Sequence, residues 1–410
     1  MELFLLQVHF TGIEILQNNK SIILEIHVRL IKQLFLEKYR LPKTLNQNST
    51  MSLLSSGPFY QMVEKGIPLF LPIGNKILTA IERCCIKEAE KFEFNHIDMT
   101  QIIPTDILSL GEQFHDGFLD QFVFLKGKME RYHLLSTPEP LLLNFLKEGL
   151  QSYRQLPIKM MFSAKFYRQL SQVQGILKTR EFRMLAGACL HERVSEKELA
   201  IEFFHKYTLH LANVFSIPIE YTYNEESKFY EYFYIHTDGE ERFNDVSAMS
   251  LAMAYEYGQE KKVIARYCGD SNRNMNAQFV TYGLGLQRLF FVILDCYRDN
   301  KGFNLPKSVR PFDIAIIPLR NEDISGCLEF ANCLQIPPDR MLIDDRCKTQ
   351  VLEKERFADY LGIPQKLFIR KREVFVKHRD ADTFLKEAFQ LSAIKKESWN
   401  HFNIQPYSQT

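Results

Sequence analysis

The pattern of apolar segments changes near Leu305 and Pro306, and this change constrains the fold more than any other feature. Downstream of it, strand-like apolar runs alternate with helical stretches. We expect strands over Phe312–Pro318, Met341–Ile343 and Lys366–Ile369. Between them we expect one helix over Ile324–Leu334 and a second that ends at about Tyr360. The alternation predicts a small α/β module with a parallel sheet.

Upstream of the change, helices and strands are mixed without such alternation. Helical spacing of apolar residues predicts helices over Asn75–Phe92 and Glu196–Phe215. Runs of β-branched and aromatic residues predict strands over Lys159–Phe162, Phe229–His236 and Gln278–Tyr282. This order predicts an α+β domain in which helices pack on an antiparallel sheet.

The 410 residues are too many for one ordinary domain. We expect residues 51–305 to form the α+β domain and residues 306–392 to form the α/β module. Residues 1–50 are expected to be an N-terminal extension of unknown role, joined through a polar segment, and residues 393–410 a C-terminal tail.

Composition excludes several classes of protein. The formal net charge is +1, so any contact with RNA must come from local basic patches. The eight cysteines include no CxxC pair or zinc-ligand spacing, which predicts free thiols in a reducing cytoplasm and no metal site built by the protein alone. No segment approaches the roughly 18 apolar residues of a membrane helix.

Several short motifs follow one another in a fixed order. They are Thr137-Pro138-Glu139, Ser152–Pro157, Thr179–Phe182, Tyr282–Arg288, and the pair Asp344–Arg346 and Leu361–Pro364. Together they resemble the class II aminoacyl-tRNA synthetases of the prolyl/threonyl branch, including their motif 2, motif 3 and anticodon-binding domain. The resemblance covers residues 57–390, and it implies a class II antiparallel sheet flanked by helices and followed by a small anticodon-binding-like α/β domain.

The resemblance implies formation of an aminoacyl-adenylate from an amino acid and ATP, with Mg²⁺. Both reactants are anions, so the protein must chiefly supply positive charge and alignment. The resemblance implies that Arg288 holds the γ-phosphate. Gly283 and Gly285 would permit close approach of the ligand, and a helix beginning near Leu286 would direct its N-terminus at the same space. A glycine turn before a buried helix, with a solvated arginine, is the alternative.

Other motif residues are assigned by the same resemblance. Thr137 and Glu139 suit a substrate ammonium group, although a helix-start signal would read the same way. Lys178, Arg180 and Phe182 are expected to contact ATP, with a solvated basic pair as the alternative.

The sequence departs from the family at charged positions. The α-phosphate arginine falls at Tyr167 and the adenine-reading glutamate at Gln169, while Arg168 is displaced by one residue. We expect Arg168 to assist the triphosphate only through a bulge or a register shift, because neighbouring strand residues point to opposite faces. Gln169 retains a hydrogen-bond acceptor for adenine.

Two further departures concern other surfaces of the domain. Thr100 replaces the proline of motif 1, which in this class forms the dimer interface. Small residues at 186–188 line the expected amino-acid pocket and argue against ordinary proline recognition.

In the C-terminal module, basic residues flank a predicted hairpin at Glu373–Val376. They are Arg370, Arg372, Lys377 and Arg379. The resemblance implies that they bind tRNA, and a charged sheet edge is the alternative.

Two functions remain open at this point. The first is an ATP-dependent amino-acid-activating ligase, acting as a homodimer and transferring the amino acid to tRNA or to a specialised acceptor. The second is a non-catalytic paralogue that binds tRNA, another nucleic acid, a nucleotide or a protein partner, which Tyr167 and Gln169 favour.

Overall fold

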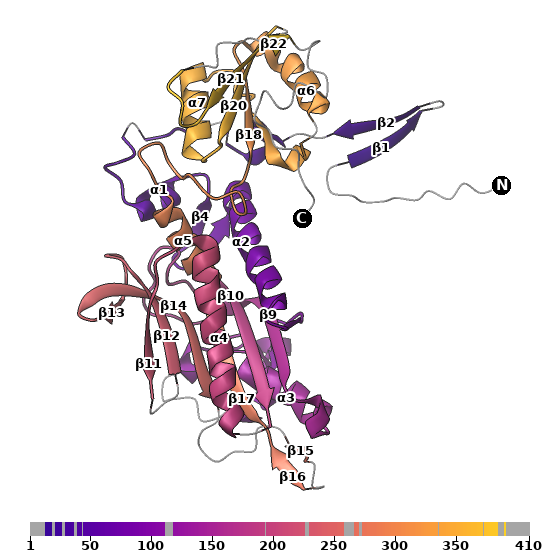
Figure 1. Cartoon of the computed structure of the whole chain (residues 1–410), viewed down its shortest axis with the longest axis vertical. Coiled ribbons are helices and arrows are strands. Elements are labelled where there is room, and N and C mark those ends of the chain that lie inside the picture. Colours follow the sequence, from indigo (N-terminus) through magenta and orange to yellow (C-terminus); the bar gives the residue numbers. More distant parts are fainter. Residues whose placement is uncertain are drawn as a thin grey trace, which may run out of the picture. The chain divides into compact units, whose positions relative to one another are not determined.

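The computed structural model describes residues 13–18, 21–26, 29–36, 39–42, 44–110, 118–192, 194–225, 229–257, 266–269, 273–334, 336–371, 373–383 and 389–390. They belong to two compact units (Figure 1). The larger unit comprises Tyr60–Phe70 and Ile77–Cys296, and the smaller comprises Met1–Phe59, Leu71–Lys76 and Tyr297–Thr410.

The larger unit contains an eight-stranded sheet in the order β11-β12-β14-β17-β10-β9-β6, with β13 added to β14. Its strands are β6 (Asn95–His96), β9 (Ile158–Tyr167), β10 (Glu181–His191), β11 (Glu220–Asn224), β12 (Phe229–Ile235), β13 (Glu241–Phe243), β14 (Val246–Tyr257) and β17 (Gln278–Gly285). Among these described strands only β6 and β9 pair in parallel, so the predicted antiparallel sheet is confirmed.

The remaining elements of this unit are short hairpins and helices, of which α2 (Pro72–Glu90) has its first residues, up to Lys76, in the smaller unit. They are β4 (Tyr60–Glu64), β5 (Ile67–Phe70), β7 (Ile102–Pro104), β8 (Tyr132–Leu134), β15 (Arg266–Cys268), β16 (Asn274–Asn276), α2 (Pro72–Glu90), α3 (Glu139–Gly149), α4 (Val194–Phe215) and α5 (Leu286–Cys296). The helices predicted over Asn75–Phe92 and Glu196–Phe215 therefore correspond to α2 and α4.

Different helices pack on the two faces of the sheet. On one face α4 packs along β10, β14 and β17 (Figure 1), and the Phe204 ring stacks on Tyr282 at 4.9 Å between centroids. A Cβ at Gly187 would approach Phe204 to 2.9 Å, so glycine at this position allows the helix to pack closely on β10. On the other face the apolar side of α3, with Leu142 and Leu146, packs in one core with Phe162.

In the smaller unit the sheet order is β22-β21-β20-β18-β19-β3. Its elements are β3 (Arg29–Leu30), α1 (Thr50–Ser56), β18 (Ile314–Pro318), α6 (Ile324–Cys333), β19 (Met341–Ile343), α7 (Val351–Tyr360), β20 (Gln365–Arg370), β21 (Glu373–His378) and β22 (Phe389–Gln390). β18 pairs in parallel with β19 and β20, as predicted, and β20 turns back into β21 as an antiparallel hairpin.

The N-terminal residues differ from the expected separate extension. β3 extends the sheet of the smaller unit by pairing in parallel with β19. The Phe59 ring contacts Phe303 at 5.3 Å and Tyr360 at 5.9 Å, and the Tyr360 hydroxyl donates to the Leu53 carbonyl at 3.1 Å. Within residues 29–59, the part that the structure describes therefore belongs to the same compact unit as the C-terminal module. A further hairpin, β1 (Ile13–Asn18) with β2 (Ser21–Ile26), lies earlier in the chain.

Candidate active site

The Glu139 carboxylate lies at the first position of α3 and is buried among hydroxyl groups. Its Oε2 accepts from Thr137 Oγ1, and its Oε1 accepts from the Tyr255 and Thr281 hydroxyls, each at 3.0 Å. Tyr255 and Thr281 are register partners on β14 and β17, so the sheet presents both hydroxyls at one point. A carboxylate at a helix N-terminus is favoured by the helix dipole, and a substrate ammonium would find an anion here.

Arg168 lies on the same side of the sheet as this carboxylate. The β9–β10 ladder is regular as far as the pair Tyr167–Glu181, and Arg168 follows it with its amide donating to the Arg180 carbonyl at 2.9 Å. Its guanidinium lies 5.3 Å from the centre of the Phe182 ring and 5.4 Å from that of Phe118. No bulge or register shift precedes Arg168, and ordinary alternation directs it toward Phe182, on the face opposite Tyr167. Its expected role at the triphosphate stays a prediction.

Electrostatic interactions link this arginine to other predicted residues. Burial lowers the pKa of Arg168, the Tyr255 and Glu139 groups oppose that change, and the charge of Arg288 adds to it. Arg168 is thus within electrostatic range of both the Glu139 carboxylate and the Arg288 guanidinium. Tyr167 instead donates from its hydroxyl to Gln101 Oε1 at 2.9 Å.

The Arg288 guanidinium, in the first turn of α5, is held by three groups. Nε donates to the Leu177 carbonyl at 2.9 Å, Nη1 donates to the Ser250 carbonyl, and Nη2 donates to Glu240 Oε1 at 3.0 Å. Lys178 pairs with the other oxygen of the same carboxylate at 2.6 Å. Lys178 and Arg288, the two cations assigned to the triphosphate, therefore share one carboxylate, that of Glu240, which no motif had indicated.

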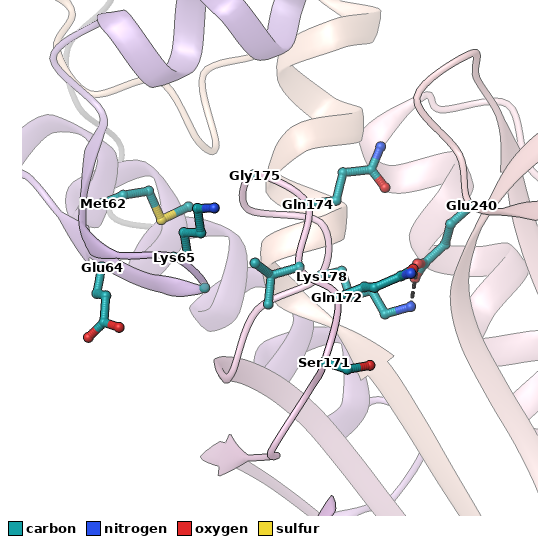
Figure 2. A pocket seen from close by; sticks show the side chains of 11 residues that line it. Met62, Glu64, Lys65, Ser171, Gln172, Gln174, Gly175, Lys178 and Glu240 are labelled. Atoms are coloured by element: carbon teal, nitrogen blue, oxygen red, sulfur yellow. Dashed lines mark hydrogen bonds and ion pairs between the residues drawn. The ribbon is translucent and has the colours of Figure 1, made fainter.

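Lys178 and Glu240 also line an open pocket of about 840 Å³. The loop 171–175 forms one wall and the β4–β5 hairpin another, with the Lys178–Glu240 ion pair at one side (Figure 2). Two lysines and two glutamates line it together with Gln172 and Gln174, so this lining suits a polar ligand.

The remaining residues predicted to bind ATP make other contacts. Arg180 donates to the carbonyls of Lys65 at 2.6 Å and Leu170 at 3.3 Å, and so fixes the β4–β5 turn to the loop after β9. The exposed Gln169 donates through Nε2 to the Phe122 carbonyl at 3.0 Å. A Cβ at Gly283 would meet Met184 Sδ at 3.0 Å, whereas one at Gly285 would make ordinary contact with Arg288, so only Gly283 has a clear packing reason.

Two of the predicted RNA-binding residues are engaged inside the smaller unit. Arg379 is buried and makes a bidentate ion pair with Asp299 at 2.5 and 2.7 Å, and Lys377 pairs with Glu355 at 2.7 Å. This corrects the expectation that both face RNA, because their carboxylate partners already neutralise them. Arg370 is exposed at the β20–β21 turn, and Arg372 lies outside the described residues.

Sequence reasoning missed Glu240, Tyr255 and Thr281. None of the three lies in one of the motifs that carry the resemblance. Among the described residues no cluster of histidine, cysteine or acidic side chains could hold a metal ion alone, and no helix is long and apolar enough to cross a membrane.

Comparison with known proteins agrees with this architecture. Residues 122–297 match the model of the class II tRNA synthetase core domain (G, H, P, S and T). The proline–tRNA ligase of Anaplasma phagocytophilum is 23% identical over 359 residues, covering 74% of this chain and 83% of that protein. The enzyme of Thermoplasma acidophilum is also 23% identical, over 327 residues, covering 76% and 69%.

Solved structures show the same fold. Giardia lamblia prolyl-tRNA synthetase in complex with prolyl-adenylate superposes with a TM-score of 0.70 at 18% identity, covering 87% of this chain and 77% of that one. The Cryptosporidium parvum enzyme, complexed with halofuginone and AMPPNP, gives 0.67 at 17% identity, covering 86% and 74%.

Residues 122–297 of the larger unit are therefore similar to the class II tRNA synthetase core domain, and the fold of the chain agrees with that similarity. Within that class the chain is most readily placed beside the prolyl-tRNA synthetases, since its relatives and structural neighbours named above all carry that activity in their names.

Proposed function

We propose that the chain activates an amino acid with ATP, forming an aminoacyl-adenylate. The observation that carries the proposal is a buried carboxylate, Glu139, close to Arg168, whose Nε donates at 3.4 Å to the carbonyl of Ser136, three residues before Glu139. The charge of Arg288 in turn contributes to lowering the pKa of Arg168. The ammonium group of an amino acid would face Glu139, and its carboxylate would face Arg168. The phosphates of ATP would then lie between Arg168 and Arg288.

In the proposed reaction a carboxylate oxygen of the amino acid attacks the α-phosphorus of ATP. The bond from that phosphorus to the bridging oxygen breaks, and pyrophosphate leaves. The nucleophile is already ionised, so positioning and charge stabilisation supply the rate enhancement. Glu139 and Thr137 hold the ammonium group, and Arg168 faces the carboxylate and α-phosphate.

Arg288 and Lys178 receive the β- and γ-phosphates, and Phe182 offers its ring to adenine. Mg²⁺ usually takes one or two protein carboxylates together with phosphate oxygens. Glu241, whose carboxylate lies 3.6 Å from the Arg288 guanidinium, is the protein ligand we assign to it. Mg²⁺ bound there would neutralise charge on the phosphates.

Exchange of pyrophosphate into ATP, measured with each of the twenty amino acids, tests the proposal. We expect exchange with one amino acid or a small related set, with proline included because of the relatives. Transfer of that amino acid to tRNA, and assembly as a homodimer, remain predictions for aminoacylation and sedimentation measurements. Absence of exchange with every amino acid would refute the proposed activity.

The second candidate is a synthetase paralogue that binds tRNA without activating an amino acid. Tyr167 favours it, because this side chain donates to Gln101 where the family resemblance expects a phosphate-binding arginine. It predicts tRNA binding that weakens steeply with salt, together with no pyrophosphate exchange.

A further inference from the structure

Glu240 occupies a position that a phosphate would be expected to take. Its two carboxylate oxygens accept separately from Lys178 at 2.6 Å and from Arg288 at 3.0 Å. A carboxylate and a terminal phosphate both bind such cations through charge-assisted hydrogen bonds. Bound nucleotide and Glu240 would therefore compete for the same donors.

Arg288 does not need Glu240 in order to keep its position. The carbonyls of Leu177 and Ser250 hold Nε and Nη1, and they belong to the loop before β10 and to β14. Only Nη2 is directed to Glu240. An incoming phosphate could therefore take the Nη2 donor while the guanidinium stays where the two carbonyls fix it.

The backbone beside Glu240 is fixed, whereas its side chain is partly exposed. A Cβ at Gly239 would lie 2.1 Å from the Ala248 carbonyl oxygen, so the turn after β12 passes against β14 too closely for any other residue. Gln174 Nε2 donates to the Asp238 carbonyl at 2.8 Å. Displacement of Glu240 thus requires only rotation of its side chain, and the 840 Å³ pocket beside it gives a nucleotide access.

We propose that Glu240 is an internal counter-anion of the nucleotide site, which holds Lys178 and Arg288 together and must be displaced by the β- and γ-phosphates of ATP. The inference rests on the proposed function, because it assigns these cations to the triphosphate. It makes the site self-inhibited: the carboxylate lowers affinity for a triphosphate and also for a free polyphosphate. Mononucleotides that do not reach these cations escape the competition.

The test is Glu240→Gln, measured by calorimetric titration with ATP, tripolyphosphate and AMP, with and without Mg²⁺. The two ion pairs are partly exposed, and such pairs are individually weak. We expect ATP and tripolyphosphate to bind roughly three- to tenfold more tightly and AMP to bind unchanged. In a Lys178→Ala background the gain should shrink, because one of the two competing pairs is already gone.

Glu64→Gln is the matched control. Glu64 lines the same pocket, and its substitution removes the same charge. Its side chain, however, points away from Lys178 (Figure 2). A general charge effect would raise ATP affinity equally in both variants and would overturn the inference. Equal ATP binding by the wild-type and Glu240→Gln proteins would overturn it while leaving the proposed activity intact.

Two further results would also count against it. Weaker ATP binding by Glu240→Gln, with or without Mg²⁺, would show that Glu240 supports the nucleotide rather than competing with it. If neither protein binds ATP or tripolyphosphate, then both the counter-anion and the proposed activity fail together.

Discussion

Carboxylates neutralise basic side chains both at the candidate active site and in the C-terminal module, but solvent reaches the two sets of ion pairs very differently. The Lys178 and Glu240 side chains are 32% and 25% exposed, whereas those of Arg346 and Asp344 are 3% and 4% exposed. Arg346 also makes a bidentate contact with Asp344, at 2.8 and 2.5 Å, and lies 4.7 Å from the centre of the Phe357 ring.

The difference separates a cation available to a ligand from one used for folding. A partly exposed pair can exchange its anion for a phosphate at small cost, while a buried pair that loses one partner leaves an uncompensated charge in the protein. The motif containing Asp344, Asp345 and Arg346 resembles a functional signature, yet here it holds the module together. We therefore expect mutations in the two regions to affect different measurements.

The largest effect is expected from Asp344→Asn. This change leaves the buried Arg346 guanidinium without its carboxylate, and breaking such a pair costs about 3–5 kcal/mol. The free energy of unfolding of the smaller unit in urea should fall by that amount. Glu322→Gln, which breaks the exposed pair with Arg320, is the control and should change stability by less than about 1 kcal/mol. Similar effects of the two substitutions would mean that burial does not distinguish these pairs.

Arg288→Ala tests the other side of the comparison. Removal of a preorganised cation from a charge-dominated site typically reduces rate about 10²- to 10³-fold. Pyrophosphate exchange should fall by that factor, while thermal unfolding should shift little because the guanidinium is partly exposed. Arg242→Ala, on the neighbouring β13, provides a control of equal charge change. An exchange rate unaffected by Arg288→Ala would remove this arginine from the proposed machinery.

Asp313 provides a pH-dependent test within the smaller unit. Burial alone would raise the pKa of Asp313, but the hydrogen bonds and charges of Arg340 and Arg310 outweigh it, so the pKa lies below its ordinary value of 3.8. A depressed carboxylate pKa stabilises the folded state above the ordinary value, and the gain is lost as pH falls through the lowered value. Asp313→Asn should therefore cost about 1.5–3 kcal/mol at neutral pH.

The cost of Asp313→Asn should be constant from pH 7 to about pH 5 and should shrink as the pH falls below the ordinary pKa of the carboxylate. Urea unfolding of both proteins across this range is the measurement. A cost that persists unchanged in acid would mean that Asp313 stabilises the fold through shape rather than charge.

The sequence predicted the parts of this molecule that depend on local pattern. The order of strands and helices followed from apolar spacing, and α5 begins at Leu286 as expected. Thr137 and Glu139 are two residues apart, so their hydrogen bond could be anticipated from the motif. The ladder continues unchanged to Arg168, but the motif alone did not show which face of the sheet carries Phe182 and which carries Tyr167.

Long-range partners could not be predicted in the same way. Thr281 and Tyr255 reach Glu139 from strands more than one hundred residues away, and only the sheet register brings them together. β3 is two residues long, too short for any periodicity, and it pairs with β19 more than three hundred residues later. The basic cluster at Lys377 and Arg379 looked like a nucleic-acid surface because the partners Glu355 and Asp299 lie elsewhere in the sequence.

The smallest expected effect concerns Arg370, which is exposed at the β20–β21 turn. If the module contacts tRNA phosphates, Arg370→Ala should reduce the slope of log affinity against log salt concentration by about one. Filter binding of tRNA at several salt concentrations measures this slope. Arg320→Ala removes an exposed cation that is paired with Glu322 in the same unit and should leave the slope unchanged. An equal loss in both variants would indicate diffuse attraction, and no loss in either would restrict RNA contact in this module to residues other than Arg370.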